Sequence, residues 1–109
     1  MNIPDYSTLS IASMAADIGL KPKHIPMLVE SYLEESEEIL TRLEEAIRVK
    51  DYESINHNAH SIKGSSGNLH FNEIYEMAKS MELAGKNSDA SFAYAEVLEC
   101  MKKGIATIS

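Results

Sequence analysis

The sequence predicts an all-α fold: an antiparallel up-down-up-down four-helix bundle with a short N-terminal capping helix. Three observations favour it. The 109 residues are rich in helix-forming types, and only five glycines and three prolines interrupt them. Apolar residues recur every three or four positions through most of the chain, which is the period of one helix face. No segment of the sequence shows the apolar–polar alternation of a half-buried strand.

The first half of the chain is expected to form a short helix and then a long one. The short helix covers residues 8–18, with Ser7 or Thr8 as its N-cap and Gly19 as its C-terminal stop. The long helix covers residues 23–50, and its outer face carries many glutamates, which we interpret as a solvated surface rather than a metal site. Its expected inward positions are Ile25, Leu28, Val29, Tyr32, Leu33, Ser36, Ile39, Leu40, Leu43, Ala46 and Ile47.

Three further amphipathic helices are expected over residues 52–68, 72–86 and 91–106, with Asp51 as the N-cap of the first and Asn72 as that of the second. Inward positions of the last two are Ile74, Tyr75, Ala78, Met81, Leu83 or Ala84, Tyr94, Leu98, Met101 and Ile105. Short turns make consecutive helices antiparallel neighbours, which gives the bundle.

Composition limits the classes of partner and compartment. A net charge of -7 argues against nucleic acid as a partner. The single cysteine, Cys100, cannot form an internal disulfide, so a reducing compartment such as the cytoplasm is expected. No apolar run approaches the ~18 residues of a membrane span, and the N-terminus does not resemble a signal peptide. We expect a single domain over residues 1–109, and the initial Met slightly favours a freestanding protein over a domain of a larger kinase.

The most informative pattern lies in the helix expected over residues 52–68. Its apolar stripe, which fixes the inward face, consists of Tyr52, Ile55, Ala59, Ile62, Ser66 and Leu69. On the same helical wheel, His60 falls ~130° from the centre of the stripe. Gly64 lies almost opposite the core, and Lys63 lies at the edge of the outer face. The pattern therefore predicts an exposed imidazole with a lysine three residues on and a glycine one turn on.

Gly64 is an unusual choice at an outward position. In an exposed helix interior, glycine costs ~1 kcal/mol relative to alanine. No left-handed turn is needed at Gly64 if the helix continues to residue 68. Glycine does leave the space beside His60 empty, so we expect that a large partner can approach the imidazole closely.

Residues 59–69 resemble the signature of histidine-containing phosphotransfer (HPt) domains, which is a small residue, His, any residue, an aliphatic, Lys, Gly, small residues and a Leu. The likeness extends over most of the chain, including the short capping helix and the long acidic helix. It implies that His60 is the phosphoacceptor, that Lys63 helps to neutralise the phosphoryl group and that Gly64 gives the partner access. One departure is His70, where many relatives carry glycine.

This resemblance implies a phosphocarrier rather than an autonomous enzyme. A neutral imidazole nitrogen is a nucleophile near pH 7 and can attack an aspartyl phosphate. The sequence has no glycine-rich phosphate loop, nucleotide motif or obvious acidic metal pocket. We therefore expect no cofactor of its own, with Mg²⁺ on the partner. The expected partners of the monomer are receiver domains of response regulators and a hybrid sensor kinase.

Two other functions compete with this interpretation. A metal-binding bundle would carry Glu-x-x-His on two helices, whereas here Glu53 precedes His57 by four residues and no second copy exists. His57 is interpreted as a polar neighbour on the same face. The second is an interaction-only bundle that docks a receiver without phosphotransfer, and the presence of His60 argues against it.

The expected docking surface combines an apolar part with an acidic rim. Ile11 and Met14 of the first helix are the candidates for the apolar part. Acidic residues of the long helix, Glu34 and Glu38 among them, are expected to surround it.

Overall fold

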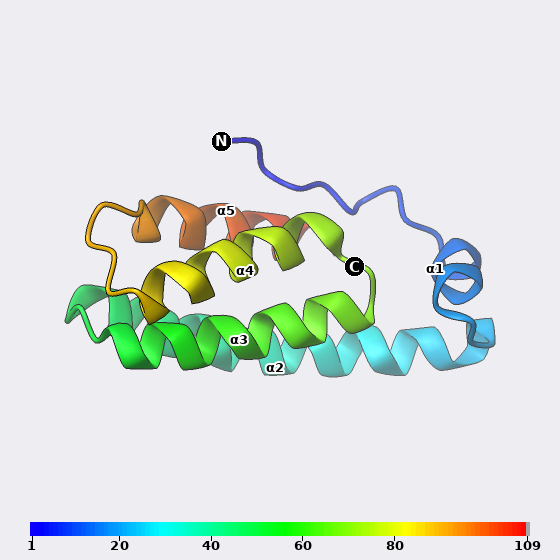
Figure 1. Cartoon of the computed structure of the whole chain (residues 1–109). Coiled ribbons are helices and arrows are strands. Elements are labelled where there is room, and N and C mark those ends of the chain that lie inside the picture. The colour runs from blue at the N-terminus through cyan, green and yellow to red at the C-terminus, as the bar shows by residue number, and fades with distance from the viewer. Residues whose placement is uncertain (109) are drawn as a thin grey trace.

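Helices make up all the regular structure of residues 1–108, the part of the chain that this computed structural model describes (Figure 1). The bounds are Ile11–Ile18 for α1, Pro22–His24 for the short 3-10 helix η1, Ile25–Arg48 for α2, Tyr52–Asn68 for α3, Asn72–Lys86 for α4 and Tyr94–Ala106 for α5. The predicted all-α class is confirmed, and so are the predicted bounds of the two helices that we call α3 and α4.

The helix α1 begins later than predicted. Its N-cap is Ser10, whose Oγ accepts a hydrogen bond from the backbone N–H of Ser13 at 3.0 Å. Ser7 and Thr8 form a turn instead, because the N–H of Ser7 donates to the carboxylate of Asp5 at 2.9 Å. The prediction of Ser7 or Thr8 as the N-cap is therefore wrong. The hydrogen bond from Ser7 to the Asp5 carboxylate closes a separate turn before the helix begins.

The connection from α1 to α2 follows the predicted signals. Gly19 ends α1 with a φ of 81°, the left-handed conformation in which glycine carries no steric penalty. Pro22 then opens η1, and α2 starts at Ile25, so the predicted range of 23–50 is two residues too long at each end. Pro26 lies in the first turn of α2, where it has no intrahelical hydrogen bond to break.

A left-handed residue also links α3 to α4. His70 has a φ of 61°, which explains why a glycine suits this position. The next residue, Phe71, is fully buried and occupies the N-cap position of α4 without a side-chain cap. Asn72 is the first helical residue, so its predicted role as the cap is wrong. Burial of the phenyl ring fixes the start of the helix in place of a polar cap.

The other two predicted starts have different outcomes. Asp51 caps α3 as predicted, since its carboxylate accepts from the backbone N–H of Ser54 at 3.2 Å. The last helix, α5, begins at Tyr94 rather than at residue 91. Asp89 explains the delay, because its carboxylate accepts hydrogen bonds from the N–H of Ser91 at 2.9 Å and from its hydroxyl at 2.6 Å, which closes a turn there.

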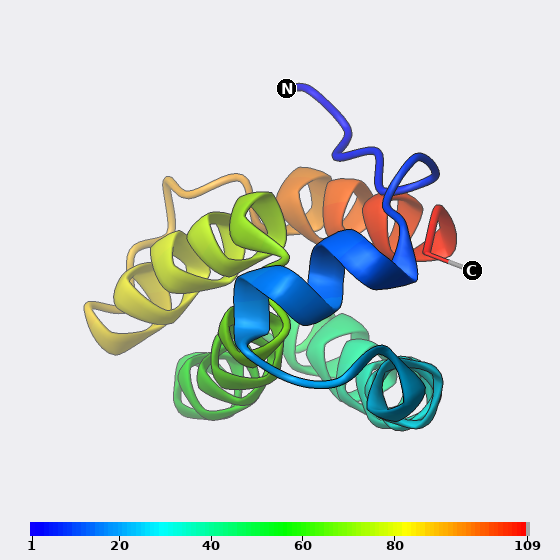
Figure 2. The ribbon, with the colours of Figure 1, turned by 90° about the vertical axis from the view of Figure 1, so that its right-hand side faces the viewer.

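The four long helices pack around a common core. α2 contacts α3 and α5, and α4 contacts the same two helices. α1 contacts the beginning of this group through α2 and η1, and Figure 2 shows it lying across the end of the other helices. The largest fully buried apolar side chains are Phe71, Ile25, Leu43, Ile55, Ile62, Ile74, Met81 and Met101.

The predicted inward positions are correct with one exception, Leu28. Leu28 is 37% exposed because it lies at the rim of the inward stripe of α2, beside the buried Val29. Leu83 is 59% exposed, and its neighbour Ala84 takes the inward position that the sequence left open between them. In α3, every stripe residue from Ile55 to Leu69 is buried and Tyr52 is half-buried. The outward face of α3 is thereby fixed.

Candidate functional site

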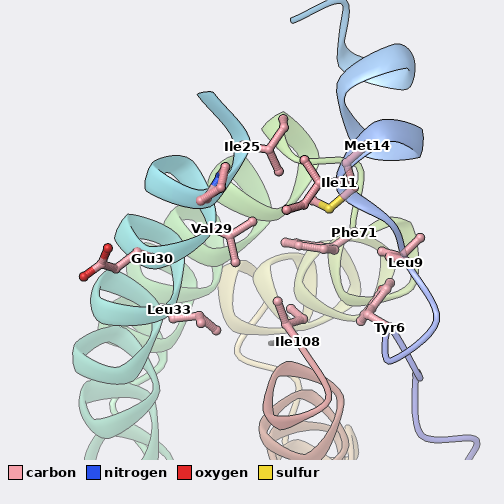
Figure 3. Close-up of a pocket in the computed structure, with 11 residues that line it drawn as sticks. Tyr6, Leu9, Ile11, Met14, Ile25, Val29, Glu30, Leu33, Phe71 and Ile108 are labelled. Carbon is pink, nitrogen blue, oxygen red and sulfur yellow. The ribbon is translucent and has the colours of Figure 1, made fainter. Parts of the chain in front are cut away.

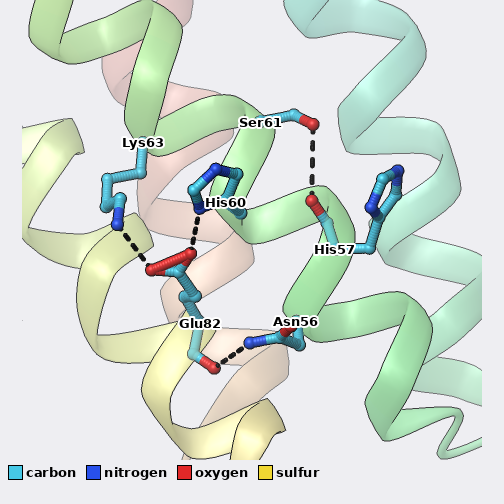
Figure 4. Close-up of polar contacts among 6 residues, drawn as sticks. All are labelled: Asn56, His57, His60, Ser61, Lys63 and Glu82. Carbon is cyan, nitrogen blue, oxygen red and sulfur yellow. Dashed lines mark hydrogen bonds and ion pairs between the residues drawn. The ribbon is translucent and has the colours of Figure 1, made fainter.

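His60 lies on the outward face of α3, as the helical wheel predicts. Its side chain is 68% exposed, while Ala59 and Ile62 on either side of it in sequence point into the core and are fully buried. Gly64, one turn further along, is also exposed. The structure therefore brings together the three predicted site residues, His60, Lys63 and Gly64, on one surface of α3, and Figure 4 shows His60 and Lys63 there.

A fourth residue, Glu82 of α4, completes the group. One carboxylate oxygen of Glu82 is hydrogen-bonded to Nδ1 of His60, and the other accepts from Nζ of Lys63 at 2.6 Å (Figure 4). The side chain of Glu82 is 19% exposed and that of Lys63 is 23% exposed. We call these three side chains, His60, Lys63 and Glu82, the histidine cluster. Lys63 is thus held against α4 rather than extending freely into solvent.

The close approach of α3 and α4 places Glu82 within reach of His60. A Cβ on Gly85 would lie 2.9 Å from the backbone N of Asn56 and 3.1 Å from the backbone O of Tyr52, so glycine lets the two helices touch. The side chain of Asn56 adds a tie, since its Nδ2 donates to the backbone O of Glu82 at 2.9 Å. Both contacts lie within one turn of Glu82 along α4.

The charges in the histidine cluster support one another. Burial alone would raise the pKa of the Glu82 carboxyl, but the hydrogen bonds from Lys63 and His60 outweigh it and hold that pKa below its ordinary value. The hydrogen bond to Glu82 likewise raises the pKa of Lys63. Glu82 is therefore an anion and Lys63 a cation at neutral pH, and they form an ion pair beside the imidazole.

The surroundings of Gly64 differ from those of the next glycine in α3. A Cβ built on Gly64 would meet no atom within 4 Å, and its backbone is that of an ordinary helix. A Cβ on Gly67 would lie 3.1 Å from the ring of Tyr75, so Gly67 is a packing glycine. The space over Gly64 is open to solvent next to His60, as predicted from the sequence.

His57 stays outside the histidine cluster. It is exposed, and Figure 4 shows its ring turned toward α2, away from Glu82. Within residues 1–108, no group of three His, Cys, Asp or Glu side chains is arranged to hold a metal ion. The Glu53 and His57 pair singled out in the sequence therefore acquires no third ligand in this part of the chain.

The residues predicted to dock a partner are found at two places. Ile11 and Met14 line an apolar cavity of about 260 Å³ between α1, the start of α2 and Ile108, which follows α5 (Figure 3). Ile11 is 49% exposed at its mouth, and Met14 is half-buried. Glu34 and Glu38 are exposed on α2. Their role in docking stays a prediction.

Sequence reasoning missed Glu82. It stands next to the buried Met81 in a helix with two other glutamates, Glu73 and Glu76, so no local pattern distinguishes it. The signal lies in the relative position of α3 and α4, which a helical wheel of either helix does not contain.

Among the described helices, none combines the length and apolar character needed to cross a membrane.

The family model of the Hpt domain matches residues 27–107, a range that contains α3, α4, α5 and almost all of α2. This chain belongs to the Hpt domain family. The match confirms the family resemblance predicted from residues 59–69. Hpt domains are phosphotransfer modules of phosphorelays. The match includes the whole histidine cluster.

A comparison of folds agrees with this membership. The Hpt domain described here resembles the crystal structure of histidine-containing phosphotransfer protein B (HptB) from Pseudomonas aeruginosa PAO1, with a TM-score of 0.75 and 24% sequence identity. The likeness covers 97% of this chain and 86% of that chain, and it shows a shared fold. A comparison with curated proteins found no match.

Proposed function

We propose that this Hpt domain is a histidine phosphocarrier in a two-component phosphorelay. His60 accepts a phosphoryl group from the aspartate of a receiver domain, or from a kinase, and passes it to the aspartate of another receiver. The observation that carries the proposal is the exposed imidazole of His60 on the outward face of α3. The ammonium of Lys63 lies beside it, and the space over Gly64 is empty.

Lys63 and Gly64 have separate roles in the proposal. The ammonium of Lys63 lies in the same cluster as the imidazole and supplies positive charge near an incoming phosphoryl group. Gly64 leaves open space on the side of His60 where a protein must approach. Positioning and charge stabilisation are the main contributions that proteins make to phosphoryl transfer, and this surface offers both.

The remaining chemistry belongs to the partner. We propose that the Hpt domain uses no cofactor of its own and that the receiver supplies the aspartate, the acidic pocket and Mg²⁺, as expected for a carrier without a phosphate-binding loop. Receiver domains and a hybrid sensor kinase are the proposed partners, and the protein is proposed to act as a cytoplasmic monomer.

The proposed architecture is an up-down-up-down bundle in one domain over residues 1–109, with α1 as its cap. Two features support it: the short connections between consecutive long helices, and the contacts of both α2 and α4 with α3 and α5. This arrangement exposes the middle of α3 along the side of the bundle, where a receiver has room to dock.

Transfer to and from purified receiver domains tests the proposed function. We expect at least one phosphorylated receiver of a panel to label the protein, with the modification on His60 by mass spectrometry. The adduct is expected to be labile in acid and stable in base, as phosphorus–nitrogen bonds to imidazole are. Labelling at another residue, or an adduct labile in alkali, contradicts the proposal.

A docking role for α1 is tested separately. If Ile11 and Met14 form the apolar part of the interface, Ile11→Asp and Met14→Asp are expected to slow transfer from a receiver while the domain stays folded. Unchanged transfer kinetics in folded variants would remove α1 from the docking surface. Charge reversal at Glu38 is expected to alter mainly the association rate and its salt dependence.

A further inference from the structure

A groove with an apolar floor runs between α2 and α5. Its volume is about 490 Å³. The floor is formed by Leu33 and Leu40 of α2, by Ile105 of α5 and by Ile108 beyond the end of α5. In Figure 3, Leu33 points toward Ile108 at one end of this groove. A cavity of about 150 Å³ with aliphatic walls holds a benzene molecule, so the groove has room for bulky aliphatic side chains.

The groove and the histidine cluster lie on opposite sides of the bundle. The histidine cluster spans α3 and α4, since Glu82 of α4 contacts both His60 and Lys63. Figures 1 and 2 show α3 and α4 on one side of the bundle and α2 and α5 on the other. A partner bound in the groove therefore leaves the outward face of α3 accessible to a receiver.

The rim of the groove on α2 carries a row of glutamates. Glu37 and Glu44 line the groove, and Glu30 precedes Glu37 by seven residues, so it follows the same edge of the helix. All three residues are exposed. We call Glu30, Glu37 and Glu44 the acidic row. Seven residues are nearly two helical turns, so successive members of the row stand about 10 Å apart along α2.

One member of the acidic row already binds a cation. Nζ of Lys102 in α5 lies 3.2 Å from a carboxylate oxygen of Glu44, across one end of the groove. Within residues 1–108, neither Glu30 nor Glu37 forms an ion pair. The groove thus offers an apolar floor and two carboxylates to a basic partner. A second copy of this chain fits less well, because two molecules with a net charge of -7 repel each other.

We propose that the groove between α2 and α5 binds a basic amphipathic helix of another protein. Lys or Arg side chains at two positions seven residues apart on that helix pair with Glu30 and Glu37. Apolar side chains three and four residues after the first cation enter the groove beside Leu33 and Leu40. The spacing matches because a helix that lies along α2 has the same rise per residue. The apolar side chains provide most of the affinity, and the charges set the orientation.

A synthetic peptide tests the groove. The probe is an alanine-rich helix of about 18 residues with Lys at two positions seven apart and Leu three and four residues after the first Lys. We expect it to shift the backbone ¹H–¹⁵N resonances of the groove and to leave that of His60 in place. The resonances to follow are those of Leu33, Glu37, Leu40 and Ile105. A matched peptide with Glu in place of both Lys is expected to bind about tenfold more weakly.

Charge reversal on α2 gives the matched pair of protein variants. Glu37→Lys is expected to weaken peptide binding by about fivefold at physiological ionic strength, because it replaces an ion pair by a repulsion. The melting temperature is expected to change little, since Glu37 is exposed. Glu35→Lys changes the net charge equally, but Glu35 lies roughly 200° around the helix from Glu37. It is expected to bind the peptide like the wild type.

Three results would overturn the proposal. Equal weakening by Glu35→Lys and Glu37→Lys would show that only net charge attracts the peptide. Resonance shifts on the outward face of α3, or slower labelling of His60 by a receiver when the peptide is bound, would place the peptide on the wrong side of the bundle. Concentration-dependent shifts of the groove resonances in the protein alone would assign the groove to a second copy of this chain.

Discussion

Glycine has opposite surroundings on the outward face of α3 and in the seam between α3 and α4. Gly64 on the outward face meets nothing within 4 Å of an added Cβ. Gly85 in the seam would place a Cβ 2.9 Å from a backbone nitrogen of α3. The first glycine leaves room for something outside the molecule, and the second brings two helices of the molecule together.

The two regions depend on each other. The seam sets the distance between α3 and α4, and that distance brings Glu82 to His60 and Lys63 on the outward face. A site on rigid helices is more precise than one on loops, because packing fixes the backbone that carries each side chain. In this protein the inner side of α3 packs against the other helices, and phosphoryl transfer is proposed for its outer side.

The largest expected effect separates function from stability on the outward face. His60→Gln is expected to abolish phosphoryl acceptance and to leave helix content and the melting temperature nearly unchanged, because the side chain is exposed. Labelling and thermal melting monitored by circular dichroism measure the two effects. His57→Gln is the matched control and is expected to keep both. Labelling retained by His60→Gln and lost by His57→Gln would reverse the assignment.

In the seam, a single methyl group is expected to be costly. Gly85→Ala forces the backbones of α3 and α4 apart, because the atoms nearest to the added Cβ include backbone N and O. We expect a loss of about 1–3 kcal/mol in the free energy of unfolding, typical of an overpacked core. Urea denaturation measures it. A Gly85→Ala protein as stable as the wild type would mean that the seam can widen freely.

Bulk on the outward face is expected to affect transfer and not folding. In Gly64→Gln, the new side chain would cover the turn N-terminal to it, next to His60. Transfer from a receiver is expected to slow by about tenfold or more, since small misplacements in a docked complex are costly. Labelling by a small phosphodonor, the control, is expected to change much less. Equal slowing with both donors would show that the substitution disturbs His60 itself.

The smallest expected effect is a gain in stability. Gly64→Ala replaces an exposed helical glycine by the best helix former, and the added methyl group meets open space. We expect the free energy of unfolding to rise by ~0.5–1 kcal/mol. Denaturant titration of Gly64→Ala and Gly85→Ala side by side compares the two regions directly. The same substitution is expected to raise the free energy of unfolding at Gly64 and to lower it at Gly85.

The sequence by itself determined the helices, their inward faces and the outward position of His60. The reason is that the helical period of 3.6 residues is a local property: once the stripe from Ile55 to Leu69 is placed inward, every other residue of α3 has a known direction. The motif around His60 was readable for the same reason, since His60, Lys63 and Gly64 all lie within about one turn of a single helix.

Some helix starts were predicted wrongly because residues that are not part of the apolar stripe determine where those helices begin. The side chains of Asp5 and Asp89 close turns, so α1 and α5 begin later than predicted. At the start of α4, the buried Phe71 occupies the N-cap position in place of a polar residue. Leu83 and Ala84 were equally good inward candidates on the wheel, and only the packing of α4 against its neighbours chose Ala84.

Only the tertiary structure decided that Glu82 belongs to the site. Its contact with His60 depends on how far α4 is rotated about its own axis and shifted along α3, and neither quantity is encoded in the periodicity of one helix. The contact of Gly85 with the backbone of α3 and the hydrogen bond from Asn56 to Glu82 fix both. The partner of the imidazole was therefore set by packing between helices, whereas the imidazole's own direction was set by the chain around it.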